Sequence, residues 1–208
     1  MDYLQQLIER YPIFKTIRND INHAYETIID SFSRGGKLLI AGNGGSAADA
    51  EHIVGELMKS FVKKRRLPDA FIKEIEGYDP EIASYLIPRL QPGLPAIALS
   101  GHSSLNTACI NDIDGNIAFS EQVYGYGKPG DVFLGISTSG NSRNIFYAAA
   151  TAKAKGLKTV ALTGCDGGSL KTISDISIIV PGKETYKIQE LHLPVYHCLC
   201  LMIEEYFF

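Results

Sequence analysis

The stretch KLLIAGNGGSAADAEH, residues 37–52, decides the fold because it joins an apolar run to a glycine-rich turn and then to a helical segment. A short apolar run that ends in glycines is typical of a buried parallel strand. The segment that starts at Ser46, SAADAEHIVGELMKSF, follows as a helix. The stretch therefore predicts a strand over 37–42, a turn, and a helix from Ser46.

The same order of strand, turn and helix recurs along the chain. Apolar runs predict further strands over 94–100, 131–137, 158–164 and 175–181, and helices over 104–110, 117–126, 142–155 and 185–208. Strands that alternate with helices form parallel sheets, because each parallel connection needs a crossover. We therefore expect an α/β protein with a doubly wound parallel sheet of about five strands.

Two segments stand outside this rhythm. Residues 1–35 carry apolar residues three or four apart, which predicts one or two helices with an apolar face that packs on a partner subunit. Residues 62–93 are rich in proline and predict an excursion with one or two short helices over a binding cleft. Its KKRR run, Lys63–Arg66, is interpreted as a solvated loop. The whole chain, 1–208, is expected to form a single domain that includes both segments.

Composition excludes several classes of partner and location. The chain has a net charge of −3 and a pI of about 6.0, so we expect no nucleic-acid surface. The sequence contains no run of about 18 apolar residues, so we expect no membrane span. The N-terminal residues lack the pattern of a signal peptide. The four cysteines lack zinc or redox spacing, and Cys198 and Cys200 lie in an apolar run. These features predict buried thiols and a cytoplasmic protein.

Two loops of similar composition, GNGGS (42–46) and STSGNS (137–142), each follow a predicted strand. Turn and cap chemistry would explain either loop alone. The carboxyl ends of parallel strands share one edge of the sheet, where small residues let a phosphate reach the N–H groups of the next helix. Neither loop is a Walker A or GxGxxG motif. The pair indicates a small phosphorylated ligand rather than a nucleotide.

The helix after the first loop carries a histidine and a carboxylate at a spacing suited to a metal. His52 and Glu56 are four residues apart, so they share one face of the helix. That spacing can present an imidazole and a carboxylate to one metal ion, and a surface contact is the alternative.

The last predicted helix contains Gln189, Glu190, His192 and His197. At about 100° per residue, Glu190 lies about 20° from His197 around the axis, Gln189 about 80° and His192 about 140°. Spacing alone therefore favours Glu190 over Gln189 as the companion of His197, and it gives His192 a structural role. A buried core histidine is the alternative interpretation of His197.

Four motifs together, AGNGGSAADAEHIVGEL, ISTSGNSRN, VALTGCDGG and TYKIQELHLPVYH, resemble those of the phosphoheptose isomerases, a family of sugar isomerase (SIS) domain proteins. The likeness covers nearly the whole chain, and residues 62–93 fit it least. It implies a flavodoxin-like three-layer α/β/α sandwich and a homotetramer with active sites near subunit interfaces. It also implies conversion of sedoheptulose 7-phosphate to D-glycero-D-manno-heptose 7-phosphate, the first step of nucleotide-activated heptose biosynthesis.

The resemblance also implies the functional residues. One zinc ion per subunit would be held by His52, Glu56, Gln189 and His197. Glu56 would act as the base and His197 as the acid that move a proton between C1 and C2. The substrate would contact these positions: Asn43, Gly44, Gly45, Ser46, Glu56, Asn111, Asp112, Ser137, Thr138, Ser139, Ser142 and Gln189.

The sequence departs from the family pattern at two points. Ser60 stands where family members often have Arg, and Lys59 or the KKRR run is the candidate replacement for that charge. Gln189 and His197 lie about 12 Å apart along a regular helix, so Gln189 is assigned as a ligand from the resemblance and not from geometry.

Three other functions are compatible with an SIS domain. A non-catalytic SIS protein would bind a protein such as the replication initiator, but the presence of His52, Glu56 and His197 argues against it. A sugar-phosphate sensor would normally carry a DNA-binding module, which this sequence lacks. An isomerase of another sugar phosphate stays open, because residues 62–93 and Ser60 differ from the commoner members.

Overall fold

Five strands form one parallel sheet in the computed structural model, which describes residues 1–208. Their order across the sheet is β2-β1-β3-β4-β5, and all four neighbouring pairs are parallel. This is the flavodoxin-like order, so the predicted fold class is confirmed. The strands are β1 (Leu38–Gly42), β2 (Ala96–Ala98), β3 (Val132–Ser137), β4 (Lys158–Thr163) and β5 (Ile176–Ile179).

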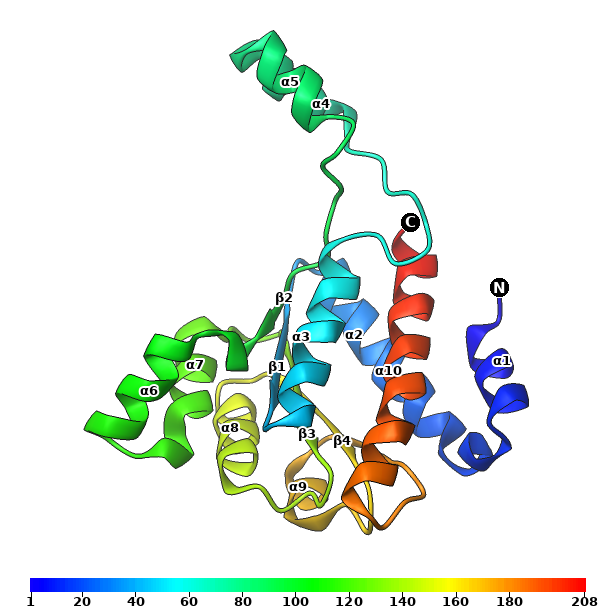
Figure 1. Ribbon diagram of the computed structural model, residues 1–208, viewed down its shortest axis with the longest axis vertical. Helices are drawn as coiled ribbons and strands as arrows, with labels where there is room; N and C mark the ends of the chain where they lie inside the picture. Colours follow the sequence, from blue (N-terminus) through cyan, green and yellow to red (C-terminus); the bar gives the residue numbers. More distant parts are fainter.

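Helices cover both faces of the sheet and produce two separate cores (Figure 1). In β1, Leu38 and Ile40 belong to one core, whereas Leu39 and Ala41 belong to the other, because successive side chains of a strand point to opposite faces. The first core is closed by α1 (Tyr3–Arg10), α2 (Arg18–Ser33), α3 (Gly45–Met58) and α10 (Thr185–Phe207). The second is closed by α7 (Ala118–Tyr126), α8 (Arg143–Ala154) and α9 (Gly168–Ile173).

Most predicted helices are present, and one was missed. The segment after β4, expected to be a turn, forms α9, which starts at Gly168; Gly167 before it has a φ of 88° and Gly168 itself a φ of 53°. Further short helices are α6 (Ser103–Asp112) and the 3-10 turns η1 (Pro12–Ile17), η2 (Leu99–Gly101) and η3 (Gly115–Ile117). Even α10, the longest helix, is not apolar enough along its length to cross a membrane.

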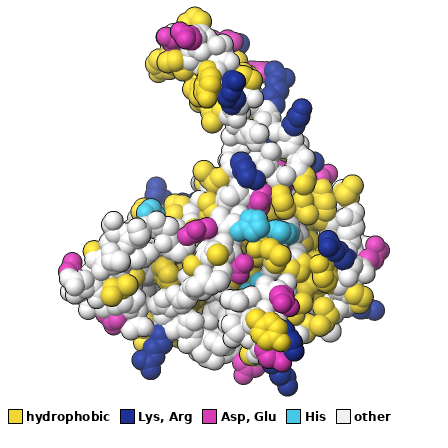
Figure 2. Space-filling view, viewed as in Figure 1, with side chains coloured by type: hydrophobic (Ala, Val, Ile, Leu, Met, Phe, Trp, Pro, Cys, Tyr) yellow, Lys and Arg dark blue, Asp and Glu magenta, His cyan; other side chains and the backbone are white.

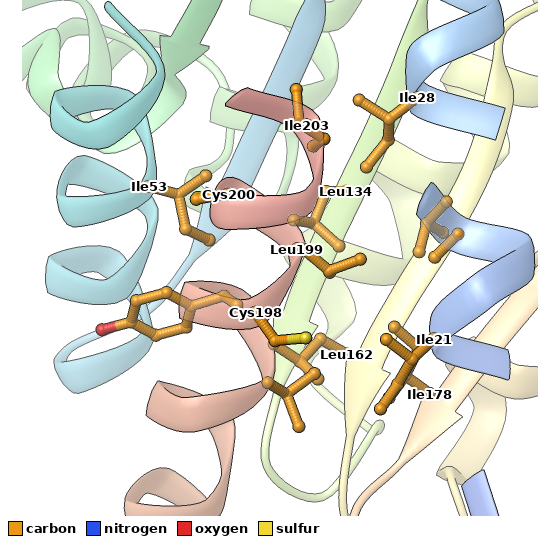
Figure 3. Close-up of a cluster of buried hydrophobic side chains, with 14 of the residues drawn as sticks. Ile21, Ile28, Ile53, Leu134, Leu162, Ile178, Cys198, Leu199, Cys200 and Ile203 are labelled. Atoms are coloured by element: carbon orange, nitrogen blue, oxygen red, sulfur yellow. The ribbon is translucent and has the colours of Figure 1, made fainter. Parts of the chain in front are cut away.

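The apolar face of residues 1–35 packs into the chain's own core. Figure 3 shows Ile21 and Ile28 of α2 close to Leu199 and Ile203 of α10. Most of the residues that suggested a subunit contact are therefore buried within the chain by α10 and the sheet, and the others are partly buried against this core. A role of this segment in oligomerisation stays a prediction, and it would use the other faces of these helices.

Residues 62–93 form an arm that extends away from the rest of the molecule (Figure 1). It contains α4 (Asp69–Tyr78) and α5 (Pro80–Leu86), so the expected short helices are confirmed. The arm covers no cleft of its own chain, and its expected place over a binding cleft stays a prediction. Apolar side chains on the arm stay exposed, and Figure 2 shows them clear of the body; they include Phe71, Tyr78, Ile82, Tyr85 and Leu90.

A buried ion pair fixes the base of the arm. Arg65 donates from Nε to Glu204 Oε1 over 3.0 Å and from a terminal nitrogen to the carbonyl of Leu57 over 2.7 Å. The carboxylate of Glu204 also accepts the backbone N–H groups of Phe61 and Val62. The side chains of Arg65 and Glu204 are 0% and 1% exposed, so the interpretation of KKRR as a solvated loop is wrong for Arg65.

His192 is fully buried in α10, and this burial predicts a pH-dependent stability. Burial lowers the pKa of His192 to about 4, and the backbone of Thr163 opposes the shift. In the unfolded chain His192 binds a proton near pH 6.5, whereas in the folded chain it does so only near pH 4. Acidification across this interval is expected to cost about 3 kcal/mol of unfolding free energy.

The test compares urea unfolding of two variants between pH 7 and pH 4. His192→Gln removes the buried titrating group, so its free energy of unfolding should fall less steeply with acidification than that of the wild type. His23→Gln, which changes an exposed histidine of α2, should retain the wild-type slope. An unchanged slope in His192→Gln would show that His192 does not control acid stability.

Candidate active site

The two predicted phosphate loops lie together at the carboxyl edge of the sheet. β1 and β3 are adjacent strands, so the segments that follow them begin side by side. The side chains of Asn43 and Asn144 exchange two hydrogen bonds, of 2.9 and 2.8 Å, and join the loops directly. Sequence reasoning missed Asn144, although its position just inside the helix after STSGNS is a signal for a loop contact.

The loop after β3 is built around a glycine that no other residue could replace. Gly140 has a φ of 67°, and a Cβ there would overlap the carbonyl of Gly167. Buried Ser137 donates from Oγ to Ser142 Oγ over 3.0 Å, and Ser139 Oγ accepts the backbone N–H of Asn141. The chain therefore passes close to the next loop while its hydroxyls stay within the turn.

Both loops open into helix N-termini that lack a side-chain cap. Gly44 precedes α3 with a φ of 55°, and Ser142 precedes α8 without capping it. Helix N-termini attract anions through their dipole and any free N–H groups. At α3 the N–H groups of Ser46 and Ala47 already bond carbonyls of the first loop. The hydroxyls of Ser137, Thr138 and Ser139 lie on the same edge of the sheet. The arrangement can bind a phosphate group.

Two helices bring three of the four predicted metal ligands together. His52 and Glu56 lie on α3, with 3.3 Å between His52 Nε2 and Glu56 Oε1. His197 approaches from α10, and its ring centroid is 4.9 Å from that of His52. Figure 2 shows histidine side chains grouped near the middle of this face with acidic side chains beside them.

Glu56 and His197 lie in different electrostatic surroundings. Lys59 Nζ lies 2.9 Å from Glu56 Oε2, so a cation from the position before Ser60 reaches the site. Burial lowers the pKa of His197 most, the neighbouring His52 lowers it further, and the charge of Glu56 opposes both. His197 Nε2 is buried without a hydrogen-bond partner. A carboxylate and two imidazoles at this distance can pass protons at neutral pH.

The donor set fits a zinc ion in chemistry. Two imidazoles and a carboxylate are the ligand types of catalytic zinc sites. The unpartnered nitrogen of His197 and the facing atoms of His52 and Glu56 are the donors such an ion would use. No three His, Cys, Asp or Glu side chains converge on one point in this structure, so binding would require these side chains to turn toward one another.

The other residues predicted near His197 lie elsewhere. Gln189 packs against Gly45, where a Cβ would meet its amide, about 12 Å from His197 along α10. It therefore lies beside the first loop, and its roles as a substrate contact and as a metal ligand both stay predictions. Glu190, which helix spacing alone favoured as the companion of His197, is exposed and makes no hydrogen bond to it, so the structure gives that pairing no support.

Asn111 and Asp112 are also separate from the two loops. They end α6, at the outer edge of the molecule (Figure 1), where their side chains bond only each other, over 2.7 Å. Their predicted contact with the substrate stays a prediction. Ser46, in contrast, is buried in the first turn of α3, where its N–H bonds the carbonyl of Asn43 over 3.0 Å.

Comparisons with known proteins agree with this geometry. The family model described as "SIS domain" matches residues 2–73 and 80–164. A phosphoheptose isomerase of Trichlorobacter lovleyi is 43% identical over 86% of this chain and 79% of that protein. A phosphoheptose isomerase of Nitratiruptor is 38% identical over 98% of this chain and 97% of that protein. The chain belongs to the phosphoheptose isomerase family of SIS-domain proteins.

Solved structures of phosphoheptose isomerases share the fold. The one from Neisseria gonorrhoeae is 31% identical, with a TM-score of 0.76, and the match covers 97% of this chain and 94% of that chain. The one from Francisella tularensis is 30% identical, with a TM-score of 0.77 and coverage of 98% and 95%. The predicted resemblance to the phosphoheptose isomerases is confirmed.

Proposed function

We propose that this protein interconverts sedoheptulose 7-phosphate and D-glycero-D-manno-heptose 7-phosphate as the first step of nucleotide-activated heptose biosynthesis. The observation that carries the proposal is the group formed by Glu56, His52 and His197, on α10 and on the helix that follows the first of the two joined loops. The names of the two relatives compared above support the same substrate class. An isomerase of another sugar phosphate is the second candidate, because Ser60 and the arm distinguish this chain.

The reaction moves one proton between C1 and C2 of the sugar. Glu56 takes the proton from one carbon, which leaves an enediol, and returns it to the other carbon. His197 donates a proton to the carbonyl oxygen and takes one back from the hydroxyl that becomes the new carbonyl. When bound, a zinc ion held by His52, Glu56 and His197 would supply Lewis acidity at the sugar oxygens.

Substrate binding divides between the reacting carbons and the phosphate. The loop from Ser137 to Ser142 and the N-terminus of α8 hold the phosphate, and Gln189 lies beside the first loop to contact the sugar. Binding energy from the remote phosphate then fixes C1 and C2 against Glu56, which lowers the barrier by orientation.

We also infer a homotetramer and a cytoplasmic location. The exposed apolar side chains of the arm support an assembly, since an apolar surface of this kind usually has a partner. Four unpaired thiols support a reducing compartment. The activity assay below is therefore run on protein whose mass has been measured by light scattering, and a mass other than that of four chains would refute the tetramer.

The test incubates zinc-loaded protein with sedoheptulose 7-phosphate and follows heptose 7-phosphate by mass spectrometry. We expect turnover that is lost on chelation, returns with zinc, and falls by at least about 100-fold in His197→Ala. His23→Ala is the matched control and should keep full activity. Absence of turnover in folded, zinc-loaded protein would refute the proposal for this substrate, and a panel of other sugar phosphates would then test the second candidate.

A further inference from the structure

A buried tyrosine joins His52 to a second carboxylate. Tyr196 of α10 is 2% exposed, and its hydroxyl lies 3.0 Å from His52 Nδ1 and 3.2 Å from Asp49 Oδ1. Asp49 lies one helical turn before His52 on α3. The three side chains therefore form a relay that ends on the nitrogen of His52 that faces away from Glu56.

The number of protons in this relay fixes its direction. A carboxylate can only accept hydrogen bonds, so the one proton of the Tyr196 hydroxyl goes to Asp49 Oδ1. The oxygen of Tyr196 is then an acceptor for His52, which must carry a hydrogen on Nδ1. In neutral His52 the lone pair consequently lies on Nε2, the atom 3.3 Å from Glu56 Oε1.

We propose that Asp49 and Tyr196 are positioning residues that hold neutral His52 in the tautomer protonated on Nδ1 and so present an unprotonated Nε2 to the active site. Histidines that bind metals are usually oriented in this way, through a hydrogen bond from the other ring nitrogen. Only the catalytic use of this relay rests on the proposed function. The tautomer of His52 can be measured without a sugar phosphate.

The hydroxyl of Tyr196 is difficult to explain by packing alone. A phenylalanine would fill the same space between α3 and α10 without burying a hydroxyl that needs a partner. Asp49 Oδ2 is buried with no partner, which is a cost that an apolar residue at this position would avoid. Both groups are explained if they serve to orient His52.

The first measurement is the tautomer of His52, read from long-range proton–nitrogen NMR of ¹⁵N-histidine-labelled protein without metal. Spectra are recorded at alkaline pH, and the tautomer is read where the ring nitrogen shifts show a neutral imidazole. Wild-type His52 should carry its proton on Nδ1. In Tyr196→Phe the proton should move to Nε2, because Nδ1 loses its acceptor while Glu56 remains beside Nε2.

The second measurement is zinc affinity by calorimetry with zinc alone. Tyr196→Phe should bind zinc about 10- to 100-fold more weakly than the wild type. Tyr206→Phe changes an exposed tyrosine of the same helix and should match the wild type in both measurements. A wild-type His52 protonated on Nε2, or a tautomer or zinc affinity in Tyr196→Phe equal to that of Tyr206→Phe, would overturn the proposal. Neither readout involves a sugar phosphate, so loss of isomerase activity alone would count only against the proposed function.

Discussion

Glu56→Gln is expected to abolish turnover of sedoheptulose 7-phosphate while the protein stays folded and still binds the sugar. The amide keeps the shape of the carboxylate but cannot accept the proton from C1 or C2. General base catalysis typically contributes 10²- to 10⁴-fold, so kcat should fall by at least about 100-fold. The carboxylate is in place for this role, since its side chain is only 12% exposed and lies against His52 and Lys59.

The measurement pairs steady-state kinetics with calorimetric binding of the substrate. Glu51→Gln is the matched control because Glu51 lies on the same helix, on an exposed surface, where it accepts a hydrogen bond from Ser100. That variant should retain kcat within about twofold. If Glu56→Gln kept wild-type turnover, Glu56 would not be the base, and a loss of binding with kcat unchanged would make it a substrate contact instead.

The sheet could be predicted from the sequence because each strand is a short apolar run. In β1, every residue from Leu38 to Gly42 is buried. A strand buried on both faces has a continuous apolar sequence, which distinguishes it from a surface segment. The bounds of all five strands lie within two residues of the predicted runs. The meeting of the two loops also followed, because parallel strands end on the same edge.

Contacts between distant helices could not be predicted in the same way. Helix spacing places His52 above Glu56 within α3, but it gives no information on which helix packs opposite. It therefore favoured Glu190 for His197, whereas α10 turns His197 toward α3 and leaves Glu190 in solvent. Tyr196 was missed for the same reason, since its partner Asp49 is 147 residues away in the chain.

The charge run KKRR shows the same limit for a buried ion pair. Neighbouring lysines and arginines usually indicate a solvated surface, and Arg66 fits this expectation at 82% exposed. Arg65 is instead covered by Glu204 and by the ring of Phe208, whose centroid lies 4.4 Å from its guanidinium carbon. Only the position of the C-terminal end of α10 distinguishes the two arginines, and the local sequence does not encode it.

Arg65→Ala is expected to lower the free energy of unfolding by about 3–5 kcal/mol, because it leaves the carboxylate of Glu204 buried without its cation. Arg66→Ala, the matched control, removes an exposed arginine paired with Asp69 and should change stability by less than about 1 kcal/mol. Urea unfolding at neutral pH measures both. Equal stabilities of the two variants would show that the buried pair does not stabilise the fold.

The contribution of the Arg65–Glu204 ion pair to the free energy of unfolding should depend on pH. Burial alone would raise the pKa of Glu204, but the backbone N–H groups of Phe61 and Val62 together with Arg65 hold it below its usual range. The pair therefore contributes fully above the ordinary glutamate pKa of about 4.3 and is lost as pH falls through the folded value. In Arg65→Ala, protonation instead relieves an unpaired buried charge. The stability difference between wild type and Arg65→Ala should therefore shrink on acidification, and a difference that stays constant below pH 5 would contradict this account of how Glu204 anchors the arm.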